Sequence, residues 1–494
     1  MLYTFFTAVA ISSSRLIHGI RNFFLLYFLV FLFLTWKLKH IGLACFITFL
    51  FGLQLVNPNK AYSIEVIRGN AILEKLYAEG YSITYFFHVA TFFAVPTLGF
   101  LVKELIVKRK LLPSTFLRLL KMFGISIIGF WLVSLYSNSR FSPFPTLSYL
   151  WLFQYSFMFL VAMGFIFFMV MYPRFRNVLI ATLVVICMTQ SAVGVTQLIL
   201  QRSIGLAFES QYLGSFSSGL DENNAVFRVF GTFMFHNQLA LCMAILYSFF
   251  FAYGLKKSSL RMLSVAGLAL VTIVLTQSRS TLIGIGLYTV LLLRENYEQL
   301  YSIMQRIGFR RLTFYSVVGF ALSAFGIIPR ILLSINTGYQ GAGLSIRVRM
   351  VREGIEALYG SPLLGYGIGT NEYVLHKLFP NGVMAVFPAA IHLAFVQMML
   401  EVGIVGLFFF FLPFLFILRK ILLTQKRSVE ADIYKLAFIG GSITVISYWM
   451  LLPHVGIIEF AFFGLILGFG GYWYYAIGAS QEHNEKNRRP HKKN

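Results

Sequence analysis

The sequence predicts an all-α polytopic membrane protein with about 12–13 transmembrane helices and a large outer loop that contains an amphipathic helix. Three observations support this fold class. The 494 residues are 58% hydrophobic and only 12% charged, and the mean hydropathy is +0.76. Apolar runs of about 20 residues, the length a helix needs to cross the hydrocarbon, recur along the chain. This composition excludes an ordinary soluble domain.

The distribution of basic residues predicts the orientation of these helices. A net charge of +23 could indicate a nucleic acid partner. The Lys and Arg residues, however, lie in short segments between apolar runs, which is the positive-inside pattern of membrane proteins. We therefore expect membrane lipids, and no nucleic acid, as partners. The segments expected on the cytoplasmic side are 37–39, 103–121, 174–176, 256–261, 294–311, 419–435 and 486–493.

The remaining connections must be outer loops, because successive crossings alternate. These outer segments are 57–80, 137–147, 201–237, 278–280 and 333–390. The assignment leaves Arg15 and Arg21 outside, against the charge rule. Either residues 1–14 dip into the membrane, or the short apolar runs flanking Lys37–His40 are misassigned. No small-residue cleavage site follows the first apolar stretch, so we expect the N-terminal segment to stay attached.

The chain divides by composition into four regions. Its cysteines lie inside apolar runs without CxxC spacing, which indicates neither a disulfide nor a metal site. Aspartate occurs only at Asp221 and Asp432, so no DxD pair exists to hold a divalent cation and a sugar phosphate. We expect no metal and no cofactor. The regions are N-terminal transmembrane helices at 1–180, a core with the two long outer loops 201–237 and 333–390 at 181–420, C-terminal transmembrane helices at 421–478, and a basic cytoplasmic tail at 479–494.

Two polar clusters interrupt the middle of the chain, and both reach the expected outer face. The first is FRVFGTFMFHNQLA, with Arg228, His236 and Asn237. Interfacial snorkelling and helix capping by Asn237 explain it as well as a functional role does. The second is the hairpin LTQSRSTLIG, where Arg279 opposes the charge rule. Arg279 either snorkels to lipid phosphate or binds a phosphate of a substrate, and the second role is favoured because an outward Arg at a span end can grip an anion.

The third cluster is SIRVRMVREGIEALYGSPLLGYGIGTNEY. Helical spacing of Arg347, Val351, Ile355 and Leu358 predicts an amphipathic helix in or on the outer surface. The charges of this helix could bind an anion, or the acids could neutralise the arginines. Its charged residues are Arg347, Arg349, Arg352, Glu353 and Glu356. The glycines that follow could present backbone N–H groups as an anion nest. They are Gly365, Gly367 and Gly369.

Two further clusters contain histidine and glutamate. His392 opens an apolar span, where a histidine is either structural or a general base near pH 7. Glu401 lies nine residues further on and about 13 Å deeper, half a turn away, so the two do not share a helix face. Burial requires Glu401 to be paired or protonated, and we expect a structural role. For Pro453, His454 and Glu459, packing or capping is the expected role.

Four of these blocks, in order, resemble the O-antigen ligase and O-antigen polymerase superfamily. RVFGTFMFHNQLA resembles the family's block before a span, and TQSRSTLIG resembles its Ser-Arg hairpin. SIRVRMVREGIEALYGSPLLGYGIGTNEY resembles its Arg-led helix and glycine turn, and IHLAFVQMMLEVGIVGL resembles its final block. The resemblance covers about residues 180–420.

The resemblance implies inverting transfer of a glycan from an undecaprenyl diphosphate carrier to a hydroxyl acceptor, without metal, at the periplasmic face of the bacterial cytoplasmic membrane. By motif, Arg279 and Arg347 would bind the diphosphate, with Arg228 as a further candidate. His392 would deprotonate the attacking hydroxyl. Residues that would support the site are His236, Asn237, Arg349, Gly365, Gly367 and Glu401.

The sequence leaves the acceptor open. A ligase hands a finished glycan to an acceptor such as lipid A-core, whereas a polymerase adds repeat units to a carrier-linked chain. The spacing from Arg349 to Gly360 fits an Arg-x10-Gly motif common in polymerases, but glycine is abundant here. A polysaccharide transporter or flippase is a more remote alternative, because transporters place ionisable groups near the bilayer midplane rather than at the outer ends of spans.

Overall fold

The structure is a computed structural model, and it describes residues 28–54, 90–204, 227–233, 235–307, 340–386, 390–424, 428–452 and 457–488. These residues form helices and connecting turns, with no strand element among them. The helices, in chain order, are α2 (Ile41–Gly52), α5 (Ala90–Val107), α6 (Ser114–Arg140), α7 (Pro145–Tyr155), α8 (Phe157–Met171), α9 (Arg176–Leu200), α10 (His236–Lys256), α11 (Leu260–Thr276), α12 (Arg279–Glu295), α13 (Tyr297–Ile307), α15 (Gln340–Leu358), α16 (Asn371–Leu378), α17 (Val383–Val386), α18 (Ala394–Leu423), α19 (Val429–Trp449) and α20 (Ile457–Arg488).

Six of the described helical segments are long and apolar enough to cross a membrane. They are Ser114–Arg140, Pro145–Met171, Pro173–Leu200, His236–Lys256, Ala394–Leu423 and Ile458–Ala479. Three shorter apolar helices accompany them, at Phe28–Leu38, Ile41–Gly52 and Leu260–Thr276. The predicted all-α polytopic membrane fold is therefore confirmed. The expected number of crossings stays a prediction, because segments 55–89, 205–226 and 308–339 lie outside the described residues, as do Arg15, Arg21, Pro453 and His454.

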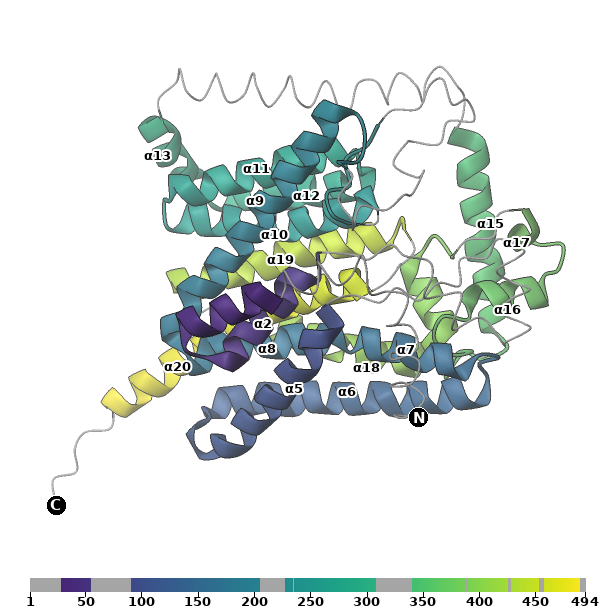
Figure 1. The fold of residues 1–494 in the computed structure, drawn as a ribbon, viewed down its shortest axis with the longest axis horizontal. Coiled ribbons are helices and arrows are strands. Elements are labelled where there is room, and N and C mark those ends of the chain that lie inside the picture. The colour runs from purple at the N-terminus through teal and green to yellow at the C-terminus, as the bar shows by residue number, and fades with distance from the viewer. Residues whose placement is uncertain are drawn as a thin grey trace.

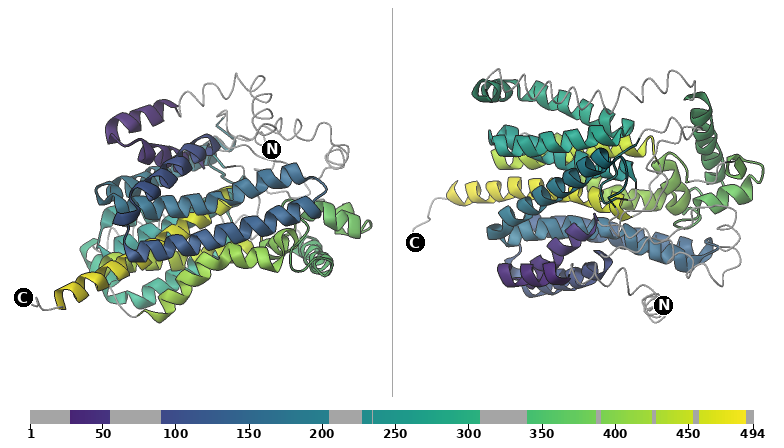
Figure 2. Two further views of the ribbon diagram at one scale, coloured as in Figure 1. Left: turned by 90° about the horizontal axis from the view of Figure 1, so that it is seen from below. Right: turned by 45° about the horizontal axis from the view of Figure 1, so that its top comes forward.

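The long helices run roughly parallel, and α15 crosses their direction at one end of the bundle together with α16 and α17 (Figure 1). Both further views keep these three helices at that same end (Figure 2). The centre of the bundle is made by helices that are buried on every side, such as α10. Close approach is possible where side chains are small: a Cβ on Gly464 of α20 would lie 2.3 Å from the carbonyl oxygen of Met158 in α8. Fully buried helices such as α10 are apolar on all sides because none of their faces contacts water.

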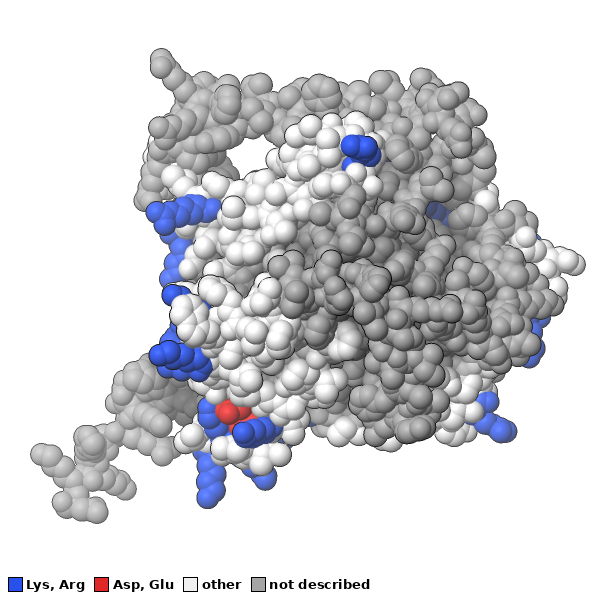
Figure 3. All heavy atoms as spheres, in the orientation of Figure 1, with Lys and Arg blue, Asp and Glu red and all other residues white. Residues whose placement is uncertain are grey.

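One end of the bundle is rich in basic side chains. The turns after α5, α8, α10, α12 and α18 lie at the end opposite to α15, α16 and α17 (Figure 1). Lys and Arg side chains gather along that edge of the molecule (Figure 3). These turns are among the segments that the basic residues are expected to place on the cytoplasmic side. We refer to the end with α15, α16 and α17 as the outer end.

A second, smaller hydrophobic core lies at the outer end, and it shows which face of α15 is buried. This core includes Met350 and Ala357 of α15 together with Ile391, all nearly inaccessible. The helix predicted from the spacing of Arg347, Val351, Ile355 and Leu358 is present; Val351 and Leu358 pack against this core, whereas Ile355 is 43% exposed. The most buried positions of α15 are Met350, Glu353 and Ala357, and Gly354 beside them leaves room for Ile391.

Candidate functional site

The glycine turn after α15 inserts into a break in α18. Gly403 has φ +67° and ψ 178°, which interrupts the helix and releases backbone groups on both sides of it. The turn pairs with these groups. Its hydrogen bonds are Tyr366 N to Leu400 O at 2.8 Å, Gly367 N to Glu401 O at 2.9 Å, Ile404 N to Pro362 O at 2.9 Å and Val405 N to Leu363 O at 3.2 Å. A Cβ at Gly403 would lie 2.2 Å from Leu363 O, so only glycine permits this approach.

The same contacts decide the role of Gly365 and Gly367. The N–H of Gly365 donates to Ser361 O at 3.0 Å, and the N–H of Gly367 donates to Glu401 O at 2.9 Å. The intervening N–H, that of Tyr366, also donates to a protein carbonyl. An anion nest at these two glycines is therefore excluded, because their donors already serve the protein. Gly367 instead joins the turn to α18 through Glu401 O, and Gly365 lies close to the backbone of Glu401.

Glu401 is buried and held by neutral donors. Its Oε1 accepts from Asn371 Nδ2 at 2.7 Å and from Gln397 Nε2 at 3.4 Å. Its Oε2 accepts from Tyr155 OH at 3.1 Å. The expectation that this carboxyl is partnered is confirmed, and its contacts are those of a residue that joins α7, α16 and α18. Glu459, from the last cluster, is likewise buried and accepts from Tyr448 OH at 3.0 Å, in agreement with a packing role.

Arg228 holds the hairpin that carries Arg279 by hydrogen bonds to its backbone. Arg228 is buried, and its Nε donates to Thr276 O at 3.0 Å while Nη2 donates to Gln277 O at 3.2 Å. Gln277 has φ +56°, the left-handed conformation that ends α11. The guanidinium thus satisfies carbonyls that the end of α11 leaves without helical partners. α12 then begins at Arg279, whose side chain is exposed at the outer end.

Two glutamines of α9 fix the segment that carries Arg228, and sequence reasoning missed both. Gln197 Oε1 accepts from Phe230 N at 3.1 Å and Gly231 N at 2.9 Å. Gln190 Oε1 accepts from Thr232 N at 3.1 Å. Gln190 and Gln197 stand seven residues apart, and so on one face of an otherwise apolar helix. That spacing is the signal that could have found them.

His236 and Asn237 open α10 next to this segment. The residue that caps α10 is Phe235, in extended conformation and without a side-chain cap hydrogen bond. Asn237 is the second residue of the helix, so the capping role that the sequence allowed for it is wrong. Both side chains are half-buried. They lie in the first turn of α10, next to the segment that Gln190 and Gln197 fix.

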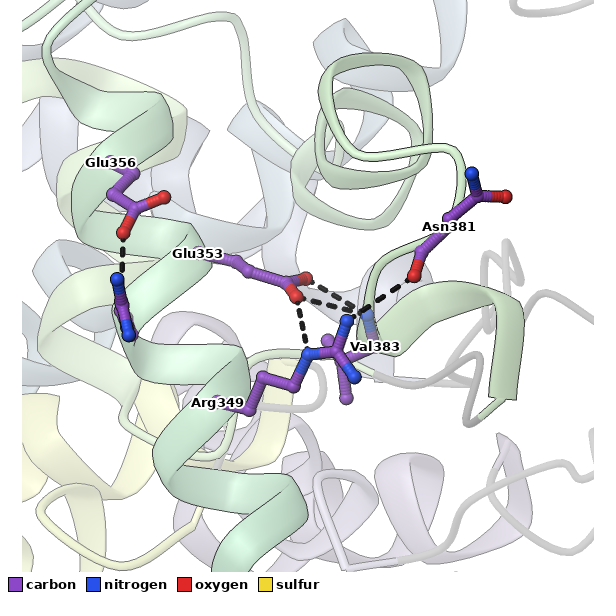
Figure 4. Close-up of polar contacts among 6 residues, drawn as sticks. Arg349, Glu353, Glu356, Asn381 and Val383 are labelled. Atoms are coloured by element: carbon purple, nitrogen blue, oxygen red, sulfur yellow. Dashed lines mark hydrogen bonds and ion pairs between the residues drawn. The ribbon is translucent and has the colours of Figure 1, made fainter.

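Two of the three arginines on α15 are neutralised by acids of the same helix. Arg349 Nε lies 2.9 Å from Glu353 Oε1, and Arg352 Nε lies 2.9 Å from Glu356 Oε1 (Figure 4). Glu353 is buried and also accepts from Val383 N with both oxygens, at 3.1 and 3.0 Å. Arg349 further donates to Asn381 O at 3.2 Å. Arg349 and Glu353 therefore fasten the segment before α17 to α15.

Arg347 differs from its two neighbours on α15. Within the described residues, no carboxylate lies within ion-pairing distance of its guanidinium. The Arg347 side chain is exposed at the surface, but neighbouring protein atoms desolvate part of it. This partial burial, followed by the positive charge of Arg279, lowers the pKa of Arg347. The two cations predicted to bind one diphosphate thus lie close enough to repel each other, although they come from α12 and α15.

His392 belongs to the same group. Burial, followed by the positive charge of Arg347, lowers the pKa of His392 to about 4. His392 Nδ1 lies 3.0 Å from Ala390 O. A carbonyl oxygen only accepts, so Nδ1 carries the proton and Nε2 carries the lone pair in the neutral ring. The structure therefore gathers Arg279, Arg347 and His392, with the histidine in the tautomer and charge state that can accept a proton.

One protein-family model matches part of the chain. Residues 264–411 match the family model described as O-antigen ligase. The match runs from α11 through the hairpin and α15 past the break in α18, and it leaves out the block at 228–240. No curated protein matches the chain. Residues 264–411, which contain Arg279, Arg347 and His392, are thus similar to the O-antigen ligase family.

Proposed function

We propose that the protein transfers a glycan from an undecaprenyl diphosphate carrier to a hydroxyl acceptor, with inversion and without metal, at the outer face of the bacterial cytoplasmic membrane. The proposal is that of an O-antigen ligase, with lipid A-core or another glycan as acceptor. The observation that supports it is that, after burial, the charge of Arg279 lowers the pKa of Arg347 and the charge of Arg347 lowers the pKa of His392. A pair of cations beside a neutral histidine suits a reaction with an anionic leaving group and a hydroxyl nucleophile.

The two arginines hold the leaving group. A diphosphate carries negative charge on non-bridging oxygens, and guanidinium groups bind such oxygens through paired N–H donors. Bringing Arg279 and Arg347 together costs electrostatic energy in the empty site, and a bound dianion offsets that repulsion. Charge on the diphosphate increases as the glycosyl bond breaks. The arginines consequently stabilise the transition state more than the bound donor.

His392 activates the acceptor. Nε2 takes the proton from the acceptor hydroxyl as its oxygen forms a bond to the anomeric carbon. The bond from that carbon to the diphosphate oxygen breaks on the opposite face, and the electron pair leaves with the diphosphate. The configuration at the anomeric carbon therefore inverts. Binding of the anionic donor also offsets the Arg347 charge, so the basicity of His392 increases when the donor is present.

Arg228 has a different part in this proposal from the one that the motif suggested. Its Nε and Nη2 donate to the carbonyls of Thr276 and Gln277, so we assign it to holding the hairpin that presents Arg279. Arg349 is likewise assigned to fastening the segment before α17, through Glu353 and Asn381 O. The diphosphate clamp then consists of Arg279 and Arg347.

The test is a transfer assay with the purified protein in lipid nanodiscs. Undecaprenyl-diphosphate glycan and acceptor are supplied with a chelator, and transfer is measured for wild type, Arg279→Ala, Arg347→Ala and His392→Ala. We expect transfer to survive the chelator and to fall by at least about 100-fold in each variant. Arg352→Ala is the matched control, because Arg352 is an exposed arginine of the same helix that pairs with Glu356. Full activity of Arg279→Ala and Arg347→Ala would exclude the clamp.

The choice of acceptor separates the related functions. A polymerase extends a second carrier-linked glycan and ignores lipid A-core, whereas a ligase uses lipid A-core. A transporter moves the carrier across proteoliposomes without forming any new glycosidic bond. The same reaction mixture, analysed for each product, distinguishes the three.

A further inference from the structure

The segment that carries His392 is held at the preceding residue. Ile391 is fully buried, and its N–H donates to the side-chain oxygen of Asn371 at 3.5 Å. His392 itself precedes α18, whose N-cap is Leu393 in extended conformation. The position of the imidazole therefore depends on side-chain and loop contacts rather than on a continuous helix.

Asn371 is the first residue of α16 and is itself fastened to the bundle. It is buried, and its Nδ2 donates to Glu401 Oε1 at 2.7 Å. The partners fix which amide atom is which, because a carboxylate accepts and a backbone N–H donates. Glu401 in turn accepts from Tyr155 OH at 3.1 Å. A chain of hydrogen bonds thus runs from α7 through Glu401 and Asn371 to the backbone beside His392.

We propose that Asn371 is a positioning residue for His392, coupling the segment that carries the imidazole to the buried carboxylate of Glu401. This rests on the transfer reaction proposed above, in which His392 is the base. Among the described residues, the side chain of Asn371 hydrogen-bonds to Glu401 and to the backbone of Ile391, and not to Arg279 or Arg347. Its removal should displace the base and leave the diphosphate clamp in place.

The expected kinetic effect follows from that separation. Without Asn371, the N–H of Ile391 loses its acceptor in a buried place, and the segment moves to satisfy it. A shift of about 1 Å in a reacting group reduces turnover by about 100-fold. We therefore expect Asn371→Ala to lower kcat by about 10–100-fold while the KM for the donor stays within about twofold.

Tyr155→Phe is the matched control. Asn371→Ala and Tyr155→Phe each remove one hydrogen-bond donor from Glu401, but Asn371→Ala also removes the acceptor of the Ile391 N–H. We expect Tyr155→Phe to keep kcat within about twofold of wild type. An equal loss of kcat in both variants would mean that Asn371 only satisfies Glu401, and would overturn the proposal.

A reciprocal exchange tests the coupling without relying on deletion. Asn371→Asp keeps an acceptor for Ile391 but places a second carboxylate against Glu401. Adding Glu401→Gln supplies an amide that can donate to the new Asp, which restores the hydrogen bond with its direction reversed. We expect the double variant to recover most of the activity that Asn371→Asp loses. A double variant as impaired as Asn371→Asp would contradict the coupling.

Positioning is also measured without any glycan transfer. His392→Cys introduces a thiol at the site, while Cys45, Cys187 and Cys242 are buried. The rate at which a membrane-impermeant alkylating reagent modifies this thiol should change several-fold when Asn371→Ala is added, and should not change with Tyr155→Phe. An unchanged rate in both would overturn the positioning role. If this readout changes while His392→Ala retains full transfer, the positioning stands and the proposed function fails.

Discussion

Gly354 of α15 and Ile391 are in direct contact at the outer end of the molecule. A Cβ on Gly354 would lie 3.0 Å from Ile391 Cδ1 and 3.0 Å from Val396 Cγ1. One residue after Ile391 comes His392, and two turns before Gly354 comes Arg347. The contact therefore helps to set the distance between α15, which carries the proposed phosphate ligand Arg347, and the segment that carries the proposed base His392.

Enlarging residue 354 should separate these two groups. Gly354→Ala gains about 1 kcal/mol of helix propensity, which offsets the tight contact, so we expect little change in stability. Gly354→Val cannot be accommodated without moving Ile391, and we expect kcat to fall in the order wild type, Ala, Val. The KM for the donor should stay constant in all three. The measurement is steady-state transfer, and an equal kcat for wild type and Gly354→Val would contradict it.

Removal of the Arg228 side chain should disorganise the hairpin. Arg228→Ala loses two hydrogen bonds from a buried charged group, each worth about 1.5–3 kcal/mol. We expect a lower thermal midpoint in detergent and a higher KM for the donor, because Arg279 is no longer presented. Arg228→Lys should recover only part of both, since an ammonium cannot reproduce the two guanidinium donors. If Arg228→Ala has the same thermal midpoint as wild type, the hydrogen bonds to the two carbonyls do not stabilise the protein.

The pH dependence of kcat/KM should follow His392. Its pKa is lowered to about 4, so the free enzyme keeps the base neutral down to mildly acidic pH. Activity is then lost only as the pH falls through that low value, since protonation fills Nε2. Arg347→Gln removes the neighbouring positive charge and should raise the pKa of His392, which moves the acidic limb to higher pH. The residual activity of this variant, measured between pH 4 and pH 8, tests the shift; an unmoved limb would contradict it.

Glu353 and Glu356 make equivalent salt bridges on α15, but we expect their removal to change the stability of the protein unequally. Both make a salt bridge to the arginine four residues earlier, at 2.9 Å. Only Glu353 is buried and accepts from Val383 N (Figure 4). We expect Glu353→Ala to destabilise the protein by about 1–3 kcal/mol, because a buried N–H loses its acceptor. Glu356→Ala should cost about 0–1 kcal/mol, as for exposed pairs. Thermal unfolding of both variants decides the point, and equal midpoints would speak against it.

The break in α18 should tolerate no side chain at residue 403. Gly403→Ala places a Cβ 2.2 Å from Leu363 O in a left-handed backbone conformation. Either the glycine turn leaves α18 or the helix closes, and both remove the hydrogen bonds at Leu400, Glu401, Ile404 and Val405. We expect poor recovery of folded protein. Gly99, where a Cβ would meet nothing within 4 Å, is the control position for Ala substitution.

Several properties of this protein are local and could be predicted from the sequence. Apolar runs and basic loops gave the polytopic fold and the grouping of loops at two ends, because hydropathy and charge act over a single span. The Ser-Arg hairpin and the Arg-led helix were recognisable as short motifs for the same reason. Arg279, Arg347 and His392 could be singled out because each lies in such a motif.

The tertiary structure decided the role of each side chain within the site. Arg228 holds Thr276 O, and Asn371 links Ile391 to Glu401; these partners are separated by tens of residues, and no periodicity relates them. Packing also decides which residues of α15 are buried: Met350 and Ala357 are inaccessible, whereas Ile355 is 43% exposed. Hydropathy and charge thus determined the polytopic fold and indicated which cations are expected to face outward. Only packing determined which of those cations meet the histidine, because hydrogen bonds and close approach depend on where distant segments come together.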